Sequence, residues 1–379
     1  MLSREQEAFR TEVREFCERV LAPAADEIDK QESFPKAILQ EMGKRGYLGI
    51  PYDKKYGGAG RDTVCYGLGV EEVSRACGST GLTMAAHTSL GAAPIYLFGN
   101  EEQKAKWLPR LASGQALGAF GLTEPGAGSD AGSTKTTAVL DGGEWVINGS
   151  KCFITTAEVA ELVIITAVTE KGIGTRGISS FLVEKGTPGF TIAKRENKMG
   201  VRGSITNELA FTDCRIPKGN LLGAPGQGFK QFMQILDGGR ISIAAMAVGL
   251  GQAALDYAAR HVKAQAVDGK PLAEEQGIQF LLADMATELE AARLLVYDAA
   301  QRKDAGINFT KQSAMAKLYA GTVAMRATTQ AMDIIGEAAG SRNLPLERYF
   351  RDVKLCEIGE GTSQVQKLVI FREILKEIS

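Results

Sequence analysis

The spacing of apolar residues changes twice along this chain, and no other feature limits the possible fold as much. In residues 1–118 apolar side chains recur at helical spacing. Residues 119–225 consist instead of short β-prone runs separated by Gly, Asp and Pro. Long amphipathic helical patterns return in residues 226–379. This order predicts a mainly α-helical protein of three domains: N-terminal helices, a small central β domain (a barrel or a sandwich) and a C-terminal helical bundle.

The charge balance argues against two classes of partner. Lys and Arg number 44 and Asp and Glu number 45, so the formal net charge is −1. Such a chain has no overall attraction to nucleic acid or to an acidic membrane surface, and any phosphate must be bound by local donors. No uninterrupted apolar run approaches the roughly 20 residues that span a bilayer. The charged, helix-like start of the sequence is unlike a secretory or transit signal, so we expect a cytoplasmic protein.

The cysteines and histidines offer little for metal or nucleophilic chemistry. The six Cys residues are scattered without CxxC spacing, and His87 and His261 are the only histidines. We interpret the cysteines as reduced, mostly buried thiols, and we expect no metal site. The GxG pattern at 249–251 lies inside an apolar helical segment and not after a strand, so we interpret it as close helix packing.

A carboxylate between two glycines is the most informative local feature. In Gly-Glu-Gly at 359–361 the glycines remove side-chain bulk, so another molecule could approach Glu360 closely. Thr362 or Ser363 can then cap a helix, from about 364 to 376, that carries an apolar stripe. From these residues alone two interpretations stay open: a reactive acid, or a solvated Glu in a glycine-rich link before a helix.

A second glycine-rich segment, Leu-Thr-Glu-Pro-Gly-Ala-Gly-Ser-Asp at 122–130, precedes strand-like sequence. Its glycines and Ser129 can turn successive backbone N–H groups toward a polar ring or a phosphate, and a plain surface turn is the alternative. Arg351 and Asp352 stand just upstream of the Glu360 loop. In this order and spacing, these segments resemble the flavin-dependent acyl-CoA dehydrogenases, and the resemblance covers nearly the whole chain.

The resemblance implies a fold and a cofactor. The family fold has an N-terminal helical domain, a middle β-barrel and a C-terminal four-helix bundle, and the cofactor is FAD. Phe153 looks like the aromatic residue packed beside the isoalloxazine, and Thr155 looks like the hydroxyl near flavin N5. The other implied contacts to the flavin, its pyrophosphate or the rest of FAD are Phe120, Leu122, Thr123, Ser129, Thr362 and Gln364.

The resemblance also implies the chemistry. One branch of the family has its base, a Glu, at the helix position held here by Arg240, whereas this chain has Glu360 in the C-terminal loop, so Glu360 is the expected base. It would remove the α-proton of an acyl-CoA thioester, flavin N5 would accept the β-hydride, and the product would be a trans-2-enoyl-CoA. Electrons would pass to an electron-transfer flavoprotein. The substrate contacts implied by the resemblance are Ser129, Asp237, Arg240 and Gly361.

Two physical requirements accompany this assignment. A thioester α-proton is very weakly acidic, so hydrogen-bond donors must stabilise the developing enolate oxygen, and the resemblance gives one such role to the backbone N–H of Glu360. Between flavin and substrate, the Glu360 carboxylate should lose water, and this should raise its pKa.

Four positions depart from the family pattern where FAD meets a neighbouring subunit. Relatives commonly carry an Arg and a Phe just before a Gly-Lys-Pro-Leu stretch, but here the preceding residues, Gln265 to Asp268, include neither. Asp333 and Glu337 add negative charge near the expected FAD pyrophosphate, which would repel it. The resemblance implies a homotetramer, and whether these positions weaken FAD binding or assembly stays open.

The acyl group of the substrate also stays open. Straight-chain enzymes of the family usually have a bulky aromatic residue next to the base, where this chain has Gly359. A wider pocket would accept a branched or ring-bearing acyl group, or a short chain with the space filled from elsewhere.

Three alternatives share the scaffold. An enoyl-CoA reductase would use the same residues with a different redox potential and partner. An acyl-CoA oxidase would react with oxygen, and such oxidases usually carry a long extension after the last helix. A non-catalytic acyl-CoA-binding protein would be favoured by the altered FAD contacts and would be colourless.

Overall fold

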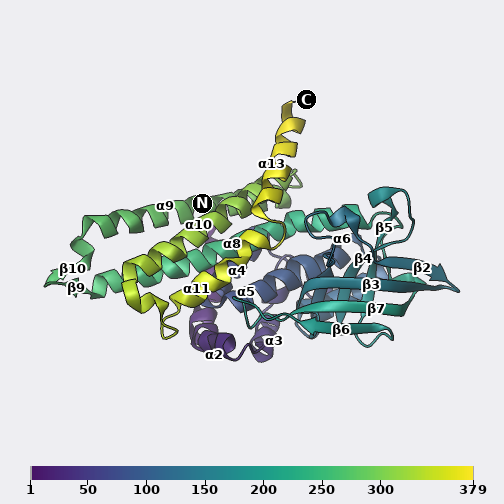
Figure 1. Cartoon of the computed structure of the whole chain (residues 1–379), viewed down its shortest axis with the longest axis horizontal. Helices are drawn as coiled ribbons and strands as arrows, with labels where there is room; N and C mark the ends of the chain where they lie inside the picture. The colour runs from purple at the N-terminus through teal and green to yellow at the C-terminus, as the bar shows by residue number, and fades with distance from the viewer. Residues whose placement is uncertain (1, 379) are drawn as a thin grey trace.

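The computed structural model describes residues 2–378 and folds them into helices, a sheet and helices again (Figure 1). The predicted order of helical, β and helical parts is confirmed. The N-terminal helices are α1 (Arg4–Phe16), α2 (Ala25–Lys30), α3 (Lys36–Lys44), α4 (Thr63–Ala76), α5 (Gly78–Ala86), the π-helical turn η5 (His87–Ala92), α6 (Ala93–Phe98) and α7 (Glu101–Ala112). The strands of the central part are β1 (Gly118–Gly121), β2 (Thr137–Asp141), β3 (Glu144–Thr155), β4 (Leu162–Val168), β5 (Ile178–Glu184), β6 (Phe190–Arg195), β7 (Thr206–Pro217) and β8 (Leu221–Leu222). The C-terminal elements are α8 (Gly228–Ala264), β9 (Ala266–Val267), β10 (Lys270–Pro271), α9 (Gln276–Asp304), α10 (Thr310–Ile335), α11 (Leu346–Val353), α12 (Leu355–Ile358) and α13 (Ser363–Ile378).

Side-chain caps fix the starts of several helices. Ser3 accepts a hydrogen bond from the Gln6 backbone, while the Gln6 side chain accepts one from the Ser3 backbone, which makes a capping box at α1. Asp62 caps α4 by accepting from the backbone N–H of Cys65 at 2.7 Å. These bonds satisfy N–H groups that have no partner inside the helix.

The strands pair in the order β6-β7-β3-β2-β4-β5-β8, and β1 lies parallel to β4. The neighbouring strands β4 and β5 are buried over almost their whole length, which explains why the sequence shows them as continuous apolar runs. The β2–β3 hairpin turns at Gly142 and Gly143, whose φ values of 59° and 96° favour glycine.

Helix α8 is the central element of the C-terminal part. A Cβ at Gly249 would lie 2.2 Å from the backbone O of Glu71 in α4, and one at Gly251 would lie 2.5 Å from a methyl of Leu289 in α9. Only glycine allows these helices to approach so closely, and the prediction that this GxG pattern serves helix packing is confirmed.

By length and composition alone, α8 is apolar enough to cross a membrane. However, 78% of its apolar 18-residue stretch is buried inside the structure. The helices around α8 therefore cover its apolar residues. The six cysteines are all buried and free, as predicted. Among the residues that the structure describes, no group of three or more His, Cys, Asp or Glu side chains could hold a metal ion.

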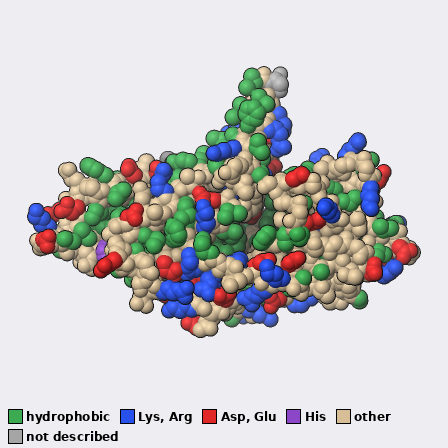
Figure 2. Space-filling view, viewed as in Figure 1, with side chains coloured by type: hydrophobic (Ala, Val, Ile, Leu, Met, Phe, Trp, Pro, Cys, Tyr) green, Lys and Arg blue, Asp and Glu red, His purple; other side chains and the backbone are tan. Residues whose placement is uncertain are grey.

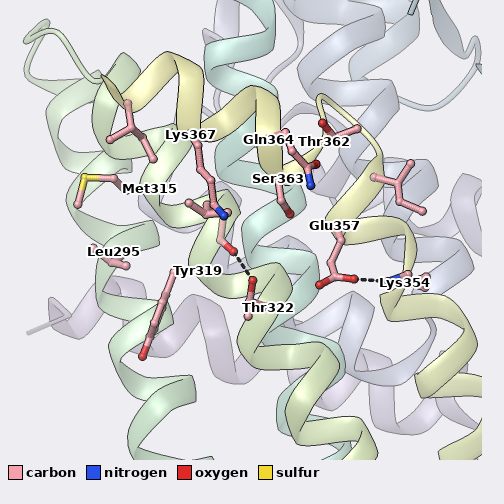
Figure 3. A pocket seen from close by; sticks show the side chains of 13 residues that line it. Leu295, Met315, Tyr319, Thr322, Lys354, Glu357, Thr362, Ser363, Gln364 and Lys367 are labelled. Carbon is pink, nitrogen blue, oxygen red and sulfur yellow. Dashed lines mark hydrogen bonds and ion pairs between the residues drawn. The ribbon is translucent and has the colours of Figure 1, made fainter. Parts of the chain in front are cut away.

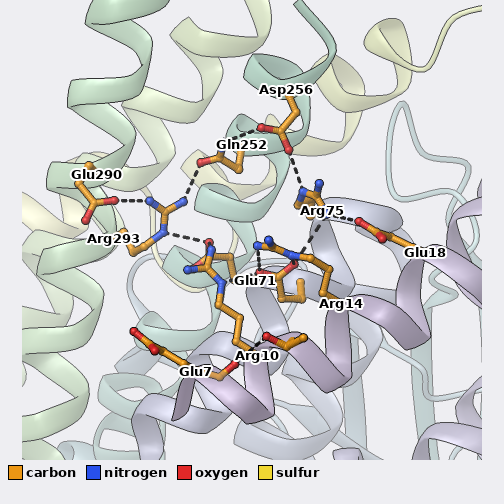
Figure 4. Close-up of polar contacts among 12 residues, drawn as sticks. Glu7, Arg10, Arg14, Glu18, Glu71, Arg75, Gln252, Asp256, Glu290 and Arg293 are labelled. Carbon is orange, nitrogen blue, oxygen red and sulfur yellow. Dashed lines mark hydrogen bonds and ion pairs between the residues drawn. The ribbon is translucent and has the colours of Figure 1, made fainter. Parts of the chain in front are cut away.

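A buried network of charges joins the N-terminal helices to the C-terminal ones (Figure 4). Glu71 of α4 accepts hydrogen bonds from Arg10 of α1 at 3.1 Å and from Arg293 of α9 at 2.9 Å. The adjacent Glu72 accepts from both Arg10 and Arg14. Removing one partner would leave an uncompensated buried charge, which typically costs about 3–5 kcal/mol. The network therefore fixes how α1, α4 and α9 sit together.

The last helix, α13, projects from the body of the molecule (Figure 1). Its predicted apolar stripe exists in the sequence, yet Leu368 and Phe371 are 69% and 59% exposed, and Val369 is buried. Figure 2 shows hydrophobic side chains on this projecting helix. Most of the stripe therefore finds no apolar cover within the described chain.

Candidate active site

The loop between α12 and α13 holds Glu360 in an unusual backbone conformation. Glu360 has φ of 56° and Gly361 has φ of 94°. A left-handed conformation at a Glu is strained and persists only where the surroundings enforce it. Here Gln366, which is fully buried, donates from Nε2 to the carbonyl O of Glu360 at 3.1 Å and to that of Gly361 at 3.0 Å. Lys317 of α10 donates to the Gly361 carbonyl O at 2.5 Å.

The carboxylate of Glu360 is turned inward against α8. Its Oε2 is buried and has no hydrogen-bond partner among the residues that the structure describes. A Cβ at Gly239 of α8 would lie 2.1 Å from that oxygen and 3.1 Å from a methyl of Leu90 in η5. The carboxylate of Glu360 therefore occupies space that is free only because Gly239 has no side chain. Burial raises the pKa of Glu360 to about 7, although the charges of Lys317 and Arg240 oppose the rise.

Next to Gly239, Arg240 is buried and forms a short ion pair. Its Nη1 donates to Oδ1 of Asp237 at 2.5 Å, and the other oxygen of Asp237 accepts from the Thr310 hydroxyl at 2.8 Å. Burial lowers the pKa of Arg240 and raises the pKa of Asp237, and the pair partly offsets both effects. The structure thus brings the predicted substrate residues Arg240 and Gly361 next to Glu360, and the ion pair with Arg240 connects Asp237 to them.

A buried salt bridge anchors the segment that resembles a flavin-binding loop. Nζ of Lys151 in β3 donates to Glu124 at 2.7 Å and to the carbonyl O of Leu122 at 3.2 Å. Glu124 also accepts from the hydroxyl of Thr134 and from the backbone N–H groups of Lys135 and Thr136. Burial alone would raise the pKa of Glu124, but the Lys151 charge and these bonds outweigh it and lower the pKa to about 2.

We predict that Lys151→Met destabilises the protein by roughly 3–5 kcal/mol, because it leaves the Glu124 carboxylate buried without its cation. Urea unfolding measures the loss. The double variant Lys151→Met/Glu124→Gln should recover part of it, since the buried charge is then gone too. Equal stability of the single variant and the unaltered protein would contradict this account.

The two predicted flavin segments lie side by side. The backbone N–H of Cys152 donates to the carbonyl O of Thr123 at 2.9 Å, which places residues 120–123 next to residues 153–155. Phe153 has φ of 58° and is 67% exposed, at a register shift between β3 and β7. An exposed aromatic ring on a strained backbone, next to the partly buried Thr155, is a typical sign of a ligand site.

Helix α8 connects the two predicted flavin-binding segments, 120–123 and 153–155, to Glu360. The ring of Phe120 stacks on that of Phe232 in α8, with centroids 4.0 Å apart. Seven residues later, two turns along the same face and about 10 Å away, Gly239 packs against the Glu360 carboxylate. The turn η5 makes a second connection, because a Cβ at Gly91 would lie 2.5 Å from the carbonyl O of Gly118 in β1.

The residues present fit FAD. Gly126 and Gly128 have nothing within 4 Å of a would-be Cβ, and Ser129 is exposed, so the backbone of this loop is open to a ligand. The ring of Phe153 is exposed, and a bound flavin would cover it. The buried oxygen of Glu360 has no hydrogen-bond partner among the described residues, and a bound substrate would supply a contact for it. Phe120, Leu122, Thr123, Phe153 and Thr155 would hold the ring system.

Thr362 and Gln364 face a different space, a groove of about 790 Å³ (Figure 3). The groove lies between the start of α13, helix α10 and Leu295 of α9, and its lining includes Glu357 but not Glu360. Thr362 also caps α13, because its hydroxyl accepts from the backbone N–H of Val365 at 3.3 Å. These two predicted FAD contacts therefore do not share a pocket with the Glu360 carboxylate within the described chain.

The positions that depart from the family pattern lie at the surface. Gln265 and Asp268 belong to the exposed β9–β10 hairpin at the far end of α8 and α9 (Figure 1), and Asp333 and Glu337 are exposed at the end of α10. None of the four lies against Glu360, so within one chain they leave the acid's surroundings unchanged.

Sequence reasoning missed Lys317, Gln366 and Gly239, which position the acid. A lysine among small and apolar residues of α10 and an amide on the buried side of α13 are signals that could have pointed to the first two. No local signal marks Gly239, because its role depends on a contact with a residue distant in sequence.

Comparisons with known proteins agree along the whole chain. Three family models match: acyl-CoA dehydrogenase N-terminal domain at residues 3–115, middle domain at 119–214 and C-terminal domain at 226–375. A probable acyl-CoA dehydrogenase of Bacillus subtilis is 52% identical over 376 residues, with 99% of both chains covered.

Two solved structures are similar in fold and sequence. The butyryl-CoA dehydrogenase of Megasphaera elsdenii has a TM-score of 0.97 at 44% identity, with 99% of both chains covered. A chain from work on the electron transferring flavoprotein of Acidaminococcus fermentans and flavin-based electron bifurcation has a TM-score of 0.98 at 46% identity, again with 99% of both chains covered.

Proposed function

The chain belongs to the acyl-CoA dehydrogenase family, and from that premise we propose that Glu360 is the base that removes the α-proton of its thioester substrate. The protein is an FAD-dependent oxidoreductase that dehydrogenates an acyl-CoA. The observation that carries the assignment of the base is the buried, unpartnered Oε2 of Glu360 on a loop held in a strained conformation.

The surroundings of Glu360 suit a base for a weak carbon acid. With a pKa of about 7, the carboxylate is more basic than an ordinary Glu and is still largely ionised just above neutrality. The backbone N–H of Glu360 has no acceptor among the residues that the structure describes, so it is free to donate to the thioester oxygen as negative charge develops there. Leu90 and Gly239 keep water from the acid on the side of α8.

The remaining residues bind and orient. When bound, FAD supplies the acceptor for the hydride that leaves the β-carbon. The 120–123 and 153–155 segments would hold the flavin ring, and Ser129 would serve its pyrophosphate or the pantetheine of the substrate. Asp237, which Arg240 and Thr310 hold in place, would contact the CoA portion, and Arg240 would lie near the catalytic carboxylate.

The acyl group in our proposal is short and is straight, branched or ring-bearing: the similarity to a butyryl-CoA dehydrogenase supports a short chain, and Gly359 puts no side chain next to the base. Gly359 has φ of −65°, which any residue adopts, and a Cβ there would make only ordinary contacts of 3.4 Å with Leu355. Nothing in the backbone or packing therefore requires glycine, so the fold would tolerate a side chain at this position.

We predict that Gly359→Tyr narrows the substrate range. A ring at this position should lower the rate of flavin reduction by branched and cyclic acyl-CoA esters about 10–100-fold and spare butyryl-CoA, since filling a pocket changes selectivity by roughly this much. Gly359→Ala is the matched control and should change little. Equal losses for all esters would count against the open pocket as the cause of selectivity.

Partners and assembly follow from the same family. We propose that an electron-transfer flavoprotein accepts the electrons, which the similarity to the Acidaminococcus fermentans chain supports. We also propose a homotetramer, and the uncovered apolar stripe of α13 fits a contact with another copy of the chain. A cytoplasmic location stays a prediction from the sequence.

Anaerobic titration of the yellow protein with a panel of straight, branched and cyclic acyl-CoA esters tests the proposed function. Bleaching of the flavin by at least one ester, with formation of the 2-enoyl-CoA, is the expected result. A protein that takes up no FAD would be the acyl-CoA-binding alternative, and one that reacts only with enoyl-CoA and a reduced flavoprotein would be the reductase.

A further inference from the structure

One lysine in the protein interior bridges both sides of the Glu360 loop. Lys317 of α10 is 1% exposed, and its Nζ donates to the carbonyl O of Glu357 at 3.1 Å and to that of Gly361 at 2.5 Å. One turn further along α10, a Cβ at Gly321 would lie 3.0 Å from the carbonyl O of Cys356. Glycine at that position lets α10 approach α12 closely enough for the lysine to reach the loop. A buried ammonium is costly, so its retention here calls for a reason.

The charge of this lysine is not neutralised by an acid. The bonds of Lys317 go to carbonyl groups, and the structure gives it no ion pair with any described Asp or Glu. Arg240, the other cation near Glu360, forms an ion pair with Asp237. The titratable groups that face Glu360 come from four helices: Tyr66 of α4, Arg240 of α8, Lys317 of α10 and Cys356 of α12. Both cations favour the ionised Glu360 carboxylate, Lys317 more than Arg240, and Lys317 is the one that has no ion pair of its own among the described residues.

We propose that Lys317 is a positioning residue of the reaction: it fixes the Glu360 loop through two carbonyl groups, and its positive charge keeps the Glu360 carboxylate ionised near neutral pH. The proposal rests on the role of Glu360 as the base. Because Lys317 is 1% exposed, in this proposal it acts through Glu360 and not by contact with substrate or flavin. Burial lowers the pKa of Lys317 to about 8, so it carries its charge over the pH range in which Glu360 titrates.

Three substitutions separate the two effects. Lys317→Met removes both the charge and the two hydrogen bonds, Lys317→Gln keeps an amide donor without the charge, and Lys317→Arg keeps the charge. Lys311→Met, at the start of the same helix and paired with Glu377 in the native protein, is the matched control. The readouts are the pH dependence of flavin reduction by an acyl-CoA ester and the hydrogen exchange of backbone amides in residues 357–363.

Loss of an opposing charge raises the pKa of a carboxylate, so the base is protonated over a wider pH range. In Lys317→Met and Lys317→Gln the pH of half-maximal reduction rate should rise by about one unit, and the rate at pH 7 should fall about fivefold, because the ionised fraction of Glu360 falls by that factor. Hydrogen exchange of the backbone amides in residues 357–363 should become fastest in Lys317→Met, because this variant loses both hydrogen bonds to the loop. Lys317→Arg should keep a pH profile close to that of the unaltered protein. Lys311→Met should match the unaltered protein in both the pH profile and the loop exchange.

An unchanged pH profile in Lys317→Gln would overturn the electrostatic role, and unchanged loop exchange in Lys317→Met would overturn the structural one. If Lys317→Met fails to fold, Lys317→Gln decides both questions: an unchanged pH profile overturns the electrostatic role, and unchanged loop exchange overturns the structural one, because its side chain is one atom too short to reach both carbonyl groups. Failure of the underlying function looks different, because then the unaltered protein would not be reduced by any ester.

Discussion

Replacing Glu360 with Gln should abolish bleaching of the flavin by substrate while leaving FAD bound. An amide has the shape of the carboxylate but cannot accept the α-proton, and loss of a positioned base typically costs about 10²–10⁴-fold in rate. Anaerobic stopped-flow absorbance measures the reduction, and the ratio of FAD to protein measures cofactor retention. The carboxylate oxygen has no hydrogen-bond partner to lose, so the fold should persist.

Glu357→Gln is the matched control for this variant. Glu357 lies three residues earlier, is partly buried and pairs with Lys354, while its contact with Lys317 uses the backbone carbonyl O. This control should reduce flavin at close to the normal rate. In the unaltered protein the rate should rise with pH through about 7, because burial raises the pKa of Glu360 to that value and only the ionised acid accepts a proton. Substantial bleaching in Glu360→Gln would refute the assignment.

Gly239→Ala should lower the rate of flavin reduction about 10²-fold without unfolding the protein, since misplacing a catalytic group by about 1 Å is enough for such a loss. The added methyl group would lie 2.1 Å from Oε2 of Glu360, so the carboxylate must leave its place. The atom in the way is the end of a flexible side chain, and alanine suits a helix better than glycine. Stability should therefore be kept or improved while activity is lost.

The neighbouring residue supplies the control. At Gly238 a Cβ would lie 3.5 Å from Nζ of Lys303, an ordinary contact, so Gly238→Ala should leave the acid undisturbed and activity near normal. Thermal unfolding and flavin reduction measured on both variants separate stability from catalysis. If Gly239→Ala and Gly238→Ala behave alike, the contact between Glu360 and Gly239 does not matter for the reaction.

Patterns that are local in sequence predicted much of this structure. Helical and β spacing gave the order of the three parts, and the GxG pattern in an apolar segment correctly indicated close helix packing, although it did not indicate that the partners are α4 and α9. Glycines on both sides of Glu360 indicated a closely approached acid, and the structure places that acid's Oε2 in a buried, unpartnered position.

The remaining features depend on contacts between distant segments. Lys317 of α10 holds the Glu360 loop by hydrogen bonds to the carbonyl groups of Glu357 and Gly361. Nothing in the residues next to Glu360 reveals this contact, because α10 is distant in sequence. The same limit applies to α13: an apolar stripe indicates a face to be covered, but the sequence does not reveal that the described chain leaves most of this stripe exposed. The composition of α8 is misleading for a related reason. It would suit a membrane span, but it does not show that neighbouring helices bury this helix.

The most direct measurement is an experimental structure of the FAD-loaded protein with an unreactive thioester analogue bound. It should place a Glu360 carboxylate oxygen about 3–3.5 Å from the α-carbon, the separation of reacting atoms poised for transfer. The thioester should lie between Glu360 and the flavin, instead of the acid lying between the other two as expected from the sequence, because the hydride must pass directly from the β-carbon to the flavin. A complex in which Glu360 points into solvent, or in which Asp237 takes its place at the α-carbon, would contradict the account.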